Sequence, residues 1–198
     1  TQAFEKGAAP NDLNRKAELF QQKALYLCLD NRTDEAFLAV NKSIELCEQI
    51  RNSFLFIKAN TLKSTICAYC QDYDNAIDLL NKVITKCDET HCIVGKIKAY
   101  TNMAAVYLAQ NDLRLSREYI DIALNLFRQS NISIVKHKPL FYNYITAFAD
   151  IKEYDELYKI IARYNDEKVL MYLDYIYKYN INKSSYGILR LNNATFNY

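Results

Sequence analysis

The middle of the chain repeats apolar and small residues at the spacing of amphipathic helices. Across residues 98–127 these positions recur three or four apart, on either side of a polar break at Asn111-Asp112. They are Ala104 and Tyr107 before the break, and Ser116, Ile120 and Ala123 after it. Residues three or four apart lie on one face of an α-helix, so each half predicts one helix with one apolar stripe. The small residues allow close approach of two backbones, and the stretch therefore predicts an antiparallel helical hairpin.

The same pattern recurs along the chain with a period of about 40 residues. In each of four successive units the second helix begins its apolar stripe with one residue, small in the first three units, and these four positions are separated by 40, 40 and 41 residues. Three more columns keep this register, four residues after that position and twelve and nine residues before it. The columns are Ala36, Ala76, Ser116 and Leu157; Val40, Leu80, Ile120 and Ile161; Ala24, Ser64, Ala104 and Ile145; and Leu27, Cys67, Tyr107 and Phe148. Columns that hold their size class over three units predict tandem helical hairpins.

This order of small residue, aromatic residue, polar turn, small residue, large apolar residue and small residue resembles the tetratricopeptide repeat (TPR) superfamily over residues 20–164. The resemblance implies an all-α fold, a right-handed α-α superhelix of about four hairpins closed by a C-terminal capping helix. Each unit here is longer by about six residues than the usual unit of about 34, so we expect either longer helices or a longer connection. The turn glycine of the family is replaced by Asn31, Gln71, Asn111 and Lys152.

The helix boundaries follow from capping residues and breaks in the pattern. Asn11 or Asp12 caps a first helix, Asn52-Ser53 caps the third, and Asp72 caps the fourth. The segment 88–95 is expected to be a longer connection before the third hairpin. The expected domains are a disordered linker or expression remnant at 1–10, a TPR-like domain at 11–180 with its capping helix from 166, and an extended tail at 181–198.

Composition narrows the class of protein. The chain has 51% hydrophobic and 24% charged residues, with three glycines and two prolines, which favours helices over a sandwich or barrel. Its 25 basic and 23 acidic residues are well mixed and give a net charge of +2, so no nucleic-acid partner is predicted for this domain. No apolar run reaches the roughly 18 residues that span a bilayer, and no signal peptide is recognisable, so we expect no membrane partner and a cytoplasmic location.

Six cysteines and two histidines raise the question of a metal site. Zinc ligation by Cys67, Cys70, Cys87, His91 and Cys92 is one hypothesis. The favoured alternative is buried reduced thiols, since Cys67 occupies a core column; in a secreted protein, Cys70 and Cys92 would be candidates for pairing. Both histidines fall in connections, with no nucleophile beside them and no glycine-rich phosphate loop, so we predict no metal, no cofactor and no enzymatic activity.

The TPR resemblance implies that the first helix of each hairpin lines a concave groove. Carried over position by position, the groove residues are Lys58, Thr61 and Thr65; Lys98, Thr101 and Asn102; and Tyr142, Asn143 and Thr146. Two lysines and two threonines recur at the same positions of the second and third units and predict a positive face. The alternative is that these lysines are simply solvated, as on any helix.

The expected function is that of a scaffold or adaptor that binds a protein or an acidic peptide in this groove. One alternative is the sensor domain of a transcription regulator or signalling kinase whose effector domain lies outside this chain, and a third is an enzyme-associated domain. The helix predicted at 166–179 has a second aromatic face. That face is either the wet side of a capping helix or a homodimer contact formed by Tyr172, Tyr175 and Tyr179.

Overall fold

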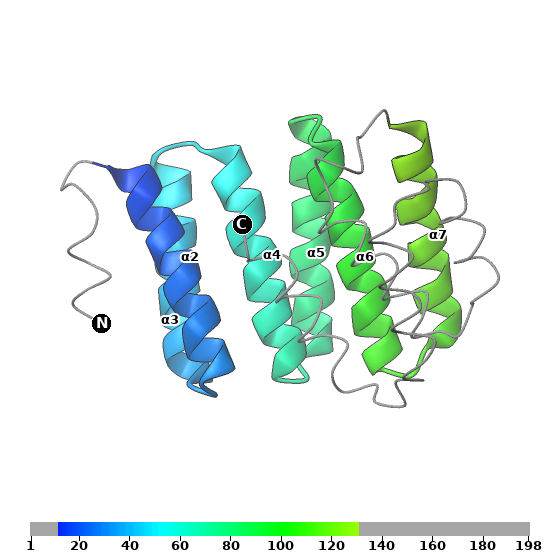
Figure 1. The fold of residues 1–198 in the computed structure, drawn as a ribbon, viewed down its shortest axis with the longest axis horizontal. Coiled ribbons are helices and arrows are strands. Elements are labelled where there is room, and N and C mark those ends of the chain that lie inside the picture. The colour runs from blue at the N-terminus through cyan, green and yellow to red at the C-terminus, as the bar shows by residue number, and fades with distance from the viewer. Residues whose placement is uncertain (1–11, 131–198) are drawn as a thin grey trace, which may run out of the picture. The chain divides into compact units, whose positions relative to one another are not determined.

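The computed structural model describes residues 12–130, and these residues form six α-helices (Figure 1). The helices are α2 (Leu13–Leu29), α3 (Thr33–Gln49), α4 (Ser53–Tyr69), α5 (Tyr73–Glu89), α6 (Ile93–Ala109) and α7 (Leu113–Gln129). They account for 86% of the described residues, among which there is no strand. The predicted all-α class is thus confirmed, and the helices pack in neighbouring pairs consistent with a helical repeat solenoid. The segment 1–10, the fourth hairpin, the helix from 166 and the tail at 181–198 lie outside the described residues.

All six helices have the same length and the same spacing. Each is 17 residues long, and three residues separate it from the next helix. The extra residues of the unit therefore lie in the helices. The predicted long connection at 88–95 is wrong: α5 continues to Glu89, α6 begins at Ile93, and Gly95 lies inside α6.

Acidic and amide side chains start four of the helices. Asp12, Asn52, Asp72 and Asp112 each precede a helix and accept a hydrogen bond from the backbone N–H three residues ahead. Such a cap satisfies one of the backbone donors that have no partner inside the helix. Three of these caps were predicted from the sequence. Arg32 precedes α3 without a capping bond and instead forms a bidentate ion pair with Glu35, with N–O distances of 2.7 and 2.6 Å.

The helices end in five turns of one kind. In each turn the second connecting residue has a left-handed backbone, and its N–H and the next N–H bond back to carbonyls of the last helical turn. In the first turn these bonds run from Asn31 to Cys28 (3.1 Å) and from Arg32 to Leu27 (2.9 Å). This is the Schellman arrangement, in which glycine is the usual residue. Here the positions are Asn31, Arg51, Gln71, His91 and Asn111.

The chain divides into two compact units, Thr1–Ala99 and Tyr100–Tyr198. In the first unit α2 packs against α3 and α4 packs against α5, while α3 also packs against α4 and joins the two hairpins. In the second unit the hydroxyl of Ser116 in α7 donates to the carbonyl of Ala104 in α6 at 2.9 Å. The ring of Tyr119 stacks on that of Tyr107, with centroids 5.2 Å apart. Small residues therefore do bring the two backbones of this hairpin together, as predicted.

The predicted columns form the core. Eleven of their twelve members within residues 12–130 are buried, and the twelfth, Tyr107, is half-buried. Residues at the predicted spacing are therefore the ones that face the core, which supports the 40-residue register.

A buried polar cluster links the first two hairpins. The side-chain amide of Gln21 in α2 donates to the hydroxyl of Ser43 in α3 and to the carbonyl of Leu55 in α4, both at 3.2 Å. The Ser43 hydroxyl in turn donates to the carbonyl of Ala17 at 2.9 Å. Because a buried amide without partners is costly, this cluster favours one relative position of the three helices.

Candidate functional site

Two of the predicted groove residues, Lys58 and Lys98, lie on helices one repeat apart in the first unit. Lys58 in α4 is exposed, and its ammonium lies 5.5 Å from the centre of the Phe54 ring. Lys98 in α6 is half-buried. Burial lowers the pKa of Lys98 to about 8, and the positive charge of Lys58 contributes further to this lowering. The two ammonium groups are therefore close enough to influence each other.

The predicted threonines of α4 use their hydroxyl protons within their own helix. Thr61 is buried and donates to the carbonyl of Ile57 at 2.7 Å; Thr65 is half-buried and donates to the carbonyl of Thr61 at 3.1 Å. Bonds of this kind, four residues back, are common for threonine inside helices. Donation to a ligand by either hydroxyl would require one of these bonds to break.

The remaining predicted groove residues lie in the second unit or beyond the described chain. In α6, Thr101 is buried and Asn102 is half-buried. The rest, Tyr142, Asn143 and Thr146, lie outside residues 12–130, as do the tyrosines of the predicted dimer contact, Tyr172, Tyr175 and Tyr179.

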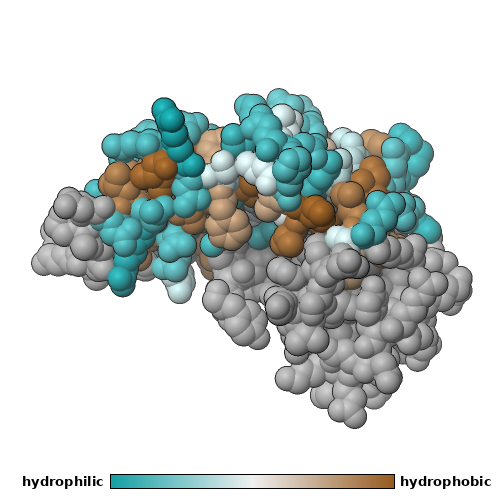
Figure 2. All heavy atoms as spheres, turned by 90° about the horizontal axis from the view of Figure 1, so that it is seen from above, coloured by the Kyte–Doolittle hydropathy of each residue, from teal (hydrophilic) through white to brown (hydrophobic). Residues whose placement is uncertain are grey.

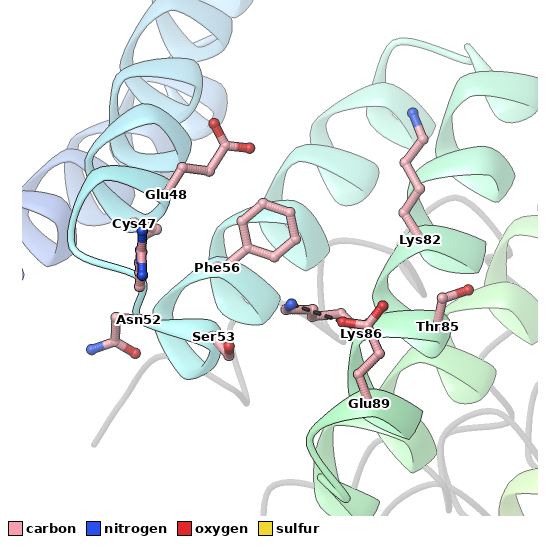
Figure 3. A pocket seen from close by; sticks show the side chains of 10 residues that line it. Cys47, Glu48, Asn52, Ser53, Phe56, Lys82, Thr85, Lys86 and Glu89 are labelled. Atoms are coloured by element: carbon pink, nitrogen blue, oxygen red, sulfur yellow. Dashed lines mark hydrogen bonds and ion pairs between the residues drawn. The ribbon is translucent and has the colours of Figure 1, made fainter.

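A pocket that the sequence did not predict lies between α3, the start of α4 and the second half of α5 (Figure 3). Its volume is about 610 Å³, and the ring of Phe56 lies in its middle, between Glu48 and Lys86. Lys86 is paired with Glu89 at 2.8 Å. The lining residues are Cys47, Glu48, Arg51, Asn52, Ser53, Phe56, Lys82, Thr85, Lys86 and Glu89. The sequence offers one hint of this pocket, the two lysines four residues apart on α5. It cannot predict the cavity itself, because the cavity depends on the separation of α3 and α5.

Exposed apolar side chains are scattered over the described helices. Figure 2 shows brown, hydrophobic residues in separate patches between teal, hydrophilic ones on the face that it presents. The large exposed apolar residues are Tyr26, Leu29, Leu38, Phe54, Ile93 and Leu113. Phe54, 60% exposed, is the one that lies against a predicted groove lysine. Apolar area beside a cation suits a partner that presents both an apolar and an acidic side chain.

All six cysteines are free thiols. Cys28, Cys47, Cys67 and Cys87 are buried, Cys92 is half-buried and Cys70 is exposed. Burial raises the pKa of Cys28 and of Cys67 to about 11, and that of Cys87 to about 12. Within residues 12–130, no three His, Cys, Asp or Glu side chains come together in a group that could hold a metal ion. The structure places Cys92 beside Cys87, to whose carbonyl its backbone N–H donates, while Cys70 lies near Thr33.

The acidic side chains at the start of α3 have structural roles. Asp34 and Glu35 lie in its first turn, where negative charge suits the helix dipole, and the hydrogen bond with Arg32 lowers the pKa of Glu35. His91 is exposed at the left-handed position of the turn before α6. None of the helices in the described part of the chain is long and apolar enough to cross a membrane.

The fold thus defines an all-α helical repeat. Comparison of the chain with protein-family models, with curated proteins and with solved structures found no match. The TPR resemblance therefore rests on the repeat pattern of the sequence alone.

Proposed function

We propose that this chain is a TPR-like protein-binding module that holds an acidic peptide against α4 and α6. The observation that carries the proposal is the electrostatic coupling of Lys58 and Lys98. They occupy corresponding positions of consecutive repeats, and the charge of Lys58 adds to the burial that lowers the pKa of Lys98. A carboxylate placed between them would relieve this repulsion and form charge-assisted hydrogen bonds.

The surroundings of Lys58 add an apolar component to the ligand. The exposed Phe54 ring beside its ammonium offers a surface for an apolar side chain of the peptide. The hydroxyl protons of the α4 threonines are already committed, so the lysines and the ring, not Thr61 and Thr65, are expected to dominate recognition. The function is binding without chemistry of its own.

Charge reversal tests the proposal. Display of short random peptides on the immobilised chain should enrich sequences that contain Asp or Glu next to an apolar residue. For the best peptide, Lys58→Glu with Lys98→Glu should weaken affinity about tenfold or more and reduce its salt dependence. The matched control is Lys42→Glu with Lys82→Glu, which changes the net charge equally on the exposed faces of α3 and α5.

The two variants give distinct results. Equal affinities for the original chain and the Lys58/Lys98 variant would refute the proposal. A loss confined to the control variant would instead locate binding at the pocket that Lys82 lines. Circular dichroism of each variant shows whether it remains folded. If a chain that carries Lys98→Glu does not fold, Lys98→Gln is used at that position instead.

Proton uptake provides an independent check. Because burial lowers the pKa of Lys98 to about 8, part of its population is neutral at that pH. A bound carboxylate favours the charged ammonium, so binding at pH about 8 should take up protons. Calorimetry in buffers of different ionisation enthalpy measures this uptake, which should disappear in Lys98→Gln.

The alternative of a sensor domain makes a different prediction. If the chain belongs to a regulator, its complete reading frame should encode a helix-turn-helix or kinase segment. Peptide binding and sensing are compatible, but only the regulator requires that second domain.

A further inference from the structure

Two cysteines face each other across the turn between α5 and α6. The backbone N–H of Cys92 donates to the carbonyl of Cys87 at 2.8 Å, which holds the two residues side by side. The neighbouring Cys92 thiol adds to the burial that raises the pKa of Cys87. Both sulfurs also lie about 3 Å from one point, the place where a β-carbon on Gly95 would be: Cys87 Sγ at 2.8 Å and Cys92 Sγ at 3.1 Å. The absence of a side chain at Gly95 leaves the space that the two sulfurs occupy.

No other turn in residues 12–130 has this combination. The other four turns have the same backbone geometry, yet at most one of the two facing residues is a cysteine. The facing pairs there are Leu27 and Arg32, Cys47 and Asn52, Cys67 and Asp72, and Tyr107 and Asp112. The residue that corresponds to Gly95 in the other described helices always carries a side chain: Arg15, Glu35, Leu55, Asn75 and Leu115.

We propose that Cys87 and Cys92 are a redox-active dithiol, which a small-molecule disulfide such as oxidised glutathione converts to an intramolecular disulfide. Disulfides need α-carbons within about 4.4–6.8 Å of each other, and a direct backbone hydrogen bond between two residues keeps them in this range. Both sulfurs lie about 3 Å from the same point, so rotation of the two side chains can bring them to bonding distance. This site is independent of the proposed peptide groove.

The exchange proceeds in two balanced steps. The half-buried Cys92 is the more accessible of the two sulfurs, and its thiolate attacks one sulfur of oxidised glutathione. The glutathione S–S bond breaks, one glutathione leaves as a thiol after taking up a proton, and a mixed disulfide forms on Cys92. Cys87 then loses its proton and attacks the sulfur of Cys92, which expels the second glutathione. Two protein thiols are oxidised, and one glutathione disulfide is reduced to two thiols.

The buried partner sets the rate. Burial raises the pKa of Cys87 to about 12, so few of these thiols are ionised at neutral pH and the second step is slow. Closure should therefore speed up about tenfold per pH unit below that pKa, because the thiolate is the attacking species. The exposed Cys70 is the competing target for glutathione, and it ends as a mixed disulfide unless a neighbouring thiol displaces the glutathione.

Peptide mapping after oxidation tests the proposal on the full chain. The purified protein is incubated with reduced and oxidised glutathione at a series of ratios, quenched with acid, alkylated and digested with trypsin. Cleavage after Lys86 and Lys96 places both cysteines in one peptide, Cys87–Lys96. We expect this peptide to escape alkylation and to lose two hydrogens at oxidising ratios, and to regain two alkylatable thiols after reduction.

Other outcomes overturn the proposal. One is a peptide 87–96 that keeps two alkylated thiols at every ratio. Another is a glutathione that remains on Cys92 after prolonged incubation at high pH. The third is a disulfide between Cys67 and Cys70, in the tryptic peptide 64–82, instead of one between Cys87 and Cys92. The variant Cys92→Ser should leave Cys87 reduced. The matched control Cys70→Ser removes an exposed thiol and should leave the oxidised fraction of peptide 87–96 unchanged.

Discussion

The five helix-ending turns make a quantitative prediction about stability. Each places a non-glycine residue at a backbone φ between 53° and 63°, which costs an L-residue about 1–2 kcal/mol relative to glycine. Glycine loses more backbone entropy on folding, which offsets roughly 0.5–1 kcal/mol of this gain. Gln71 is exposed, and its role in the turn is a backbone bond to Ala68 at 3.0 Å that glycine keeps. Gln71→Gly should therefore raise the free energy of unfolding by about 0.5–1 kcal/mol.

Urea denaturation followed by circular dichroism measures this change. The midpoint should rise while the slope m stays the same, because the buried surface does not change. Two control variants test whether the gain comes from the left-handed backbone of the turn and not from the introduction of glycine as such. Lys82→Gly, inside α5, should lower the free energy of unfolding by about 0.7 kcal/mol. Asn111→Gly should gain less than Gln71→Gly, because asparagine tolerates the left-handed region. If Gln71→Gly were neutral or destabilising while Lys82→Gly behaved as expected, the assignment of strain to these turns would be refuted.

Three further predictions concern the core and the charges. Ala104→Leu should cost about 1–3 kcal/mol in urea denaturation, since a larger side chain separates Ala104 from the Ser116 hydroxyl that bonds to its carbonyl; a change below a few tenths would contradict the register. Gln21→Leu should cost about 1–3 kcal/mol and show less than additive loss with Ser43→Ala, because the two side chains share one hydrogen bond. The pKa of Lys98 is about 8 in the folded chain and ordinarily about 10.5, so the unfolded chain binds more protons between these values. Stability relative to Lys98→Met should therefore rise by about 2–3 kcal/mol from pH 8 to 10.5, and a flat difference would refute the burial of this ammonium.

Local sequence rules predicted some features of the turns and failed at others. The caps at Asp12, Asn52 and Asp72 were predictable because a carboxylate or amide at that position satisfies a free backbone N–H. The turn at His91 was not predictable, because neither a capping side chain nor a turn glycine marks it, and the predicted connection therefore ran from 88 to 95. The backbone bonds of the turn nevertheless join α5, which ends at Glu89, to α6, which begins at Ile93 and includes Gly95.

For the candidate site, the repeat register predicts that Lys58 and Lys98 occupy corresponding positions of consecutive units. It could not show that the hydroxyl of Thr61 is committed to its own helix, since that depends on burial and on a side-chain rotamer. Nor could it reveal the pocket around Phe56, whose lining comes from three helices and whose volume depends on how far apart they lie.

By itself the sequence determined the helical class, the 40-residue register and the identity of the core columns, because these depend on the periodic placement of apolar and small residues along one chain. Tertiary structure decided that the extra residues of each unit lengthen the helices, which thiols lie side by side, and which polar side chains form hydrogen bonds within the protein. Those outcomes depend on distances between residues of different helices. Cys87 and Cys92 illustrate the difference: five residues apart in the chain, they are brought into contact by a turn that has no capping residue in the sequence and by a glycine without a side chain.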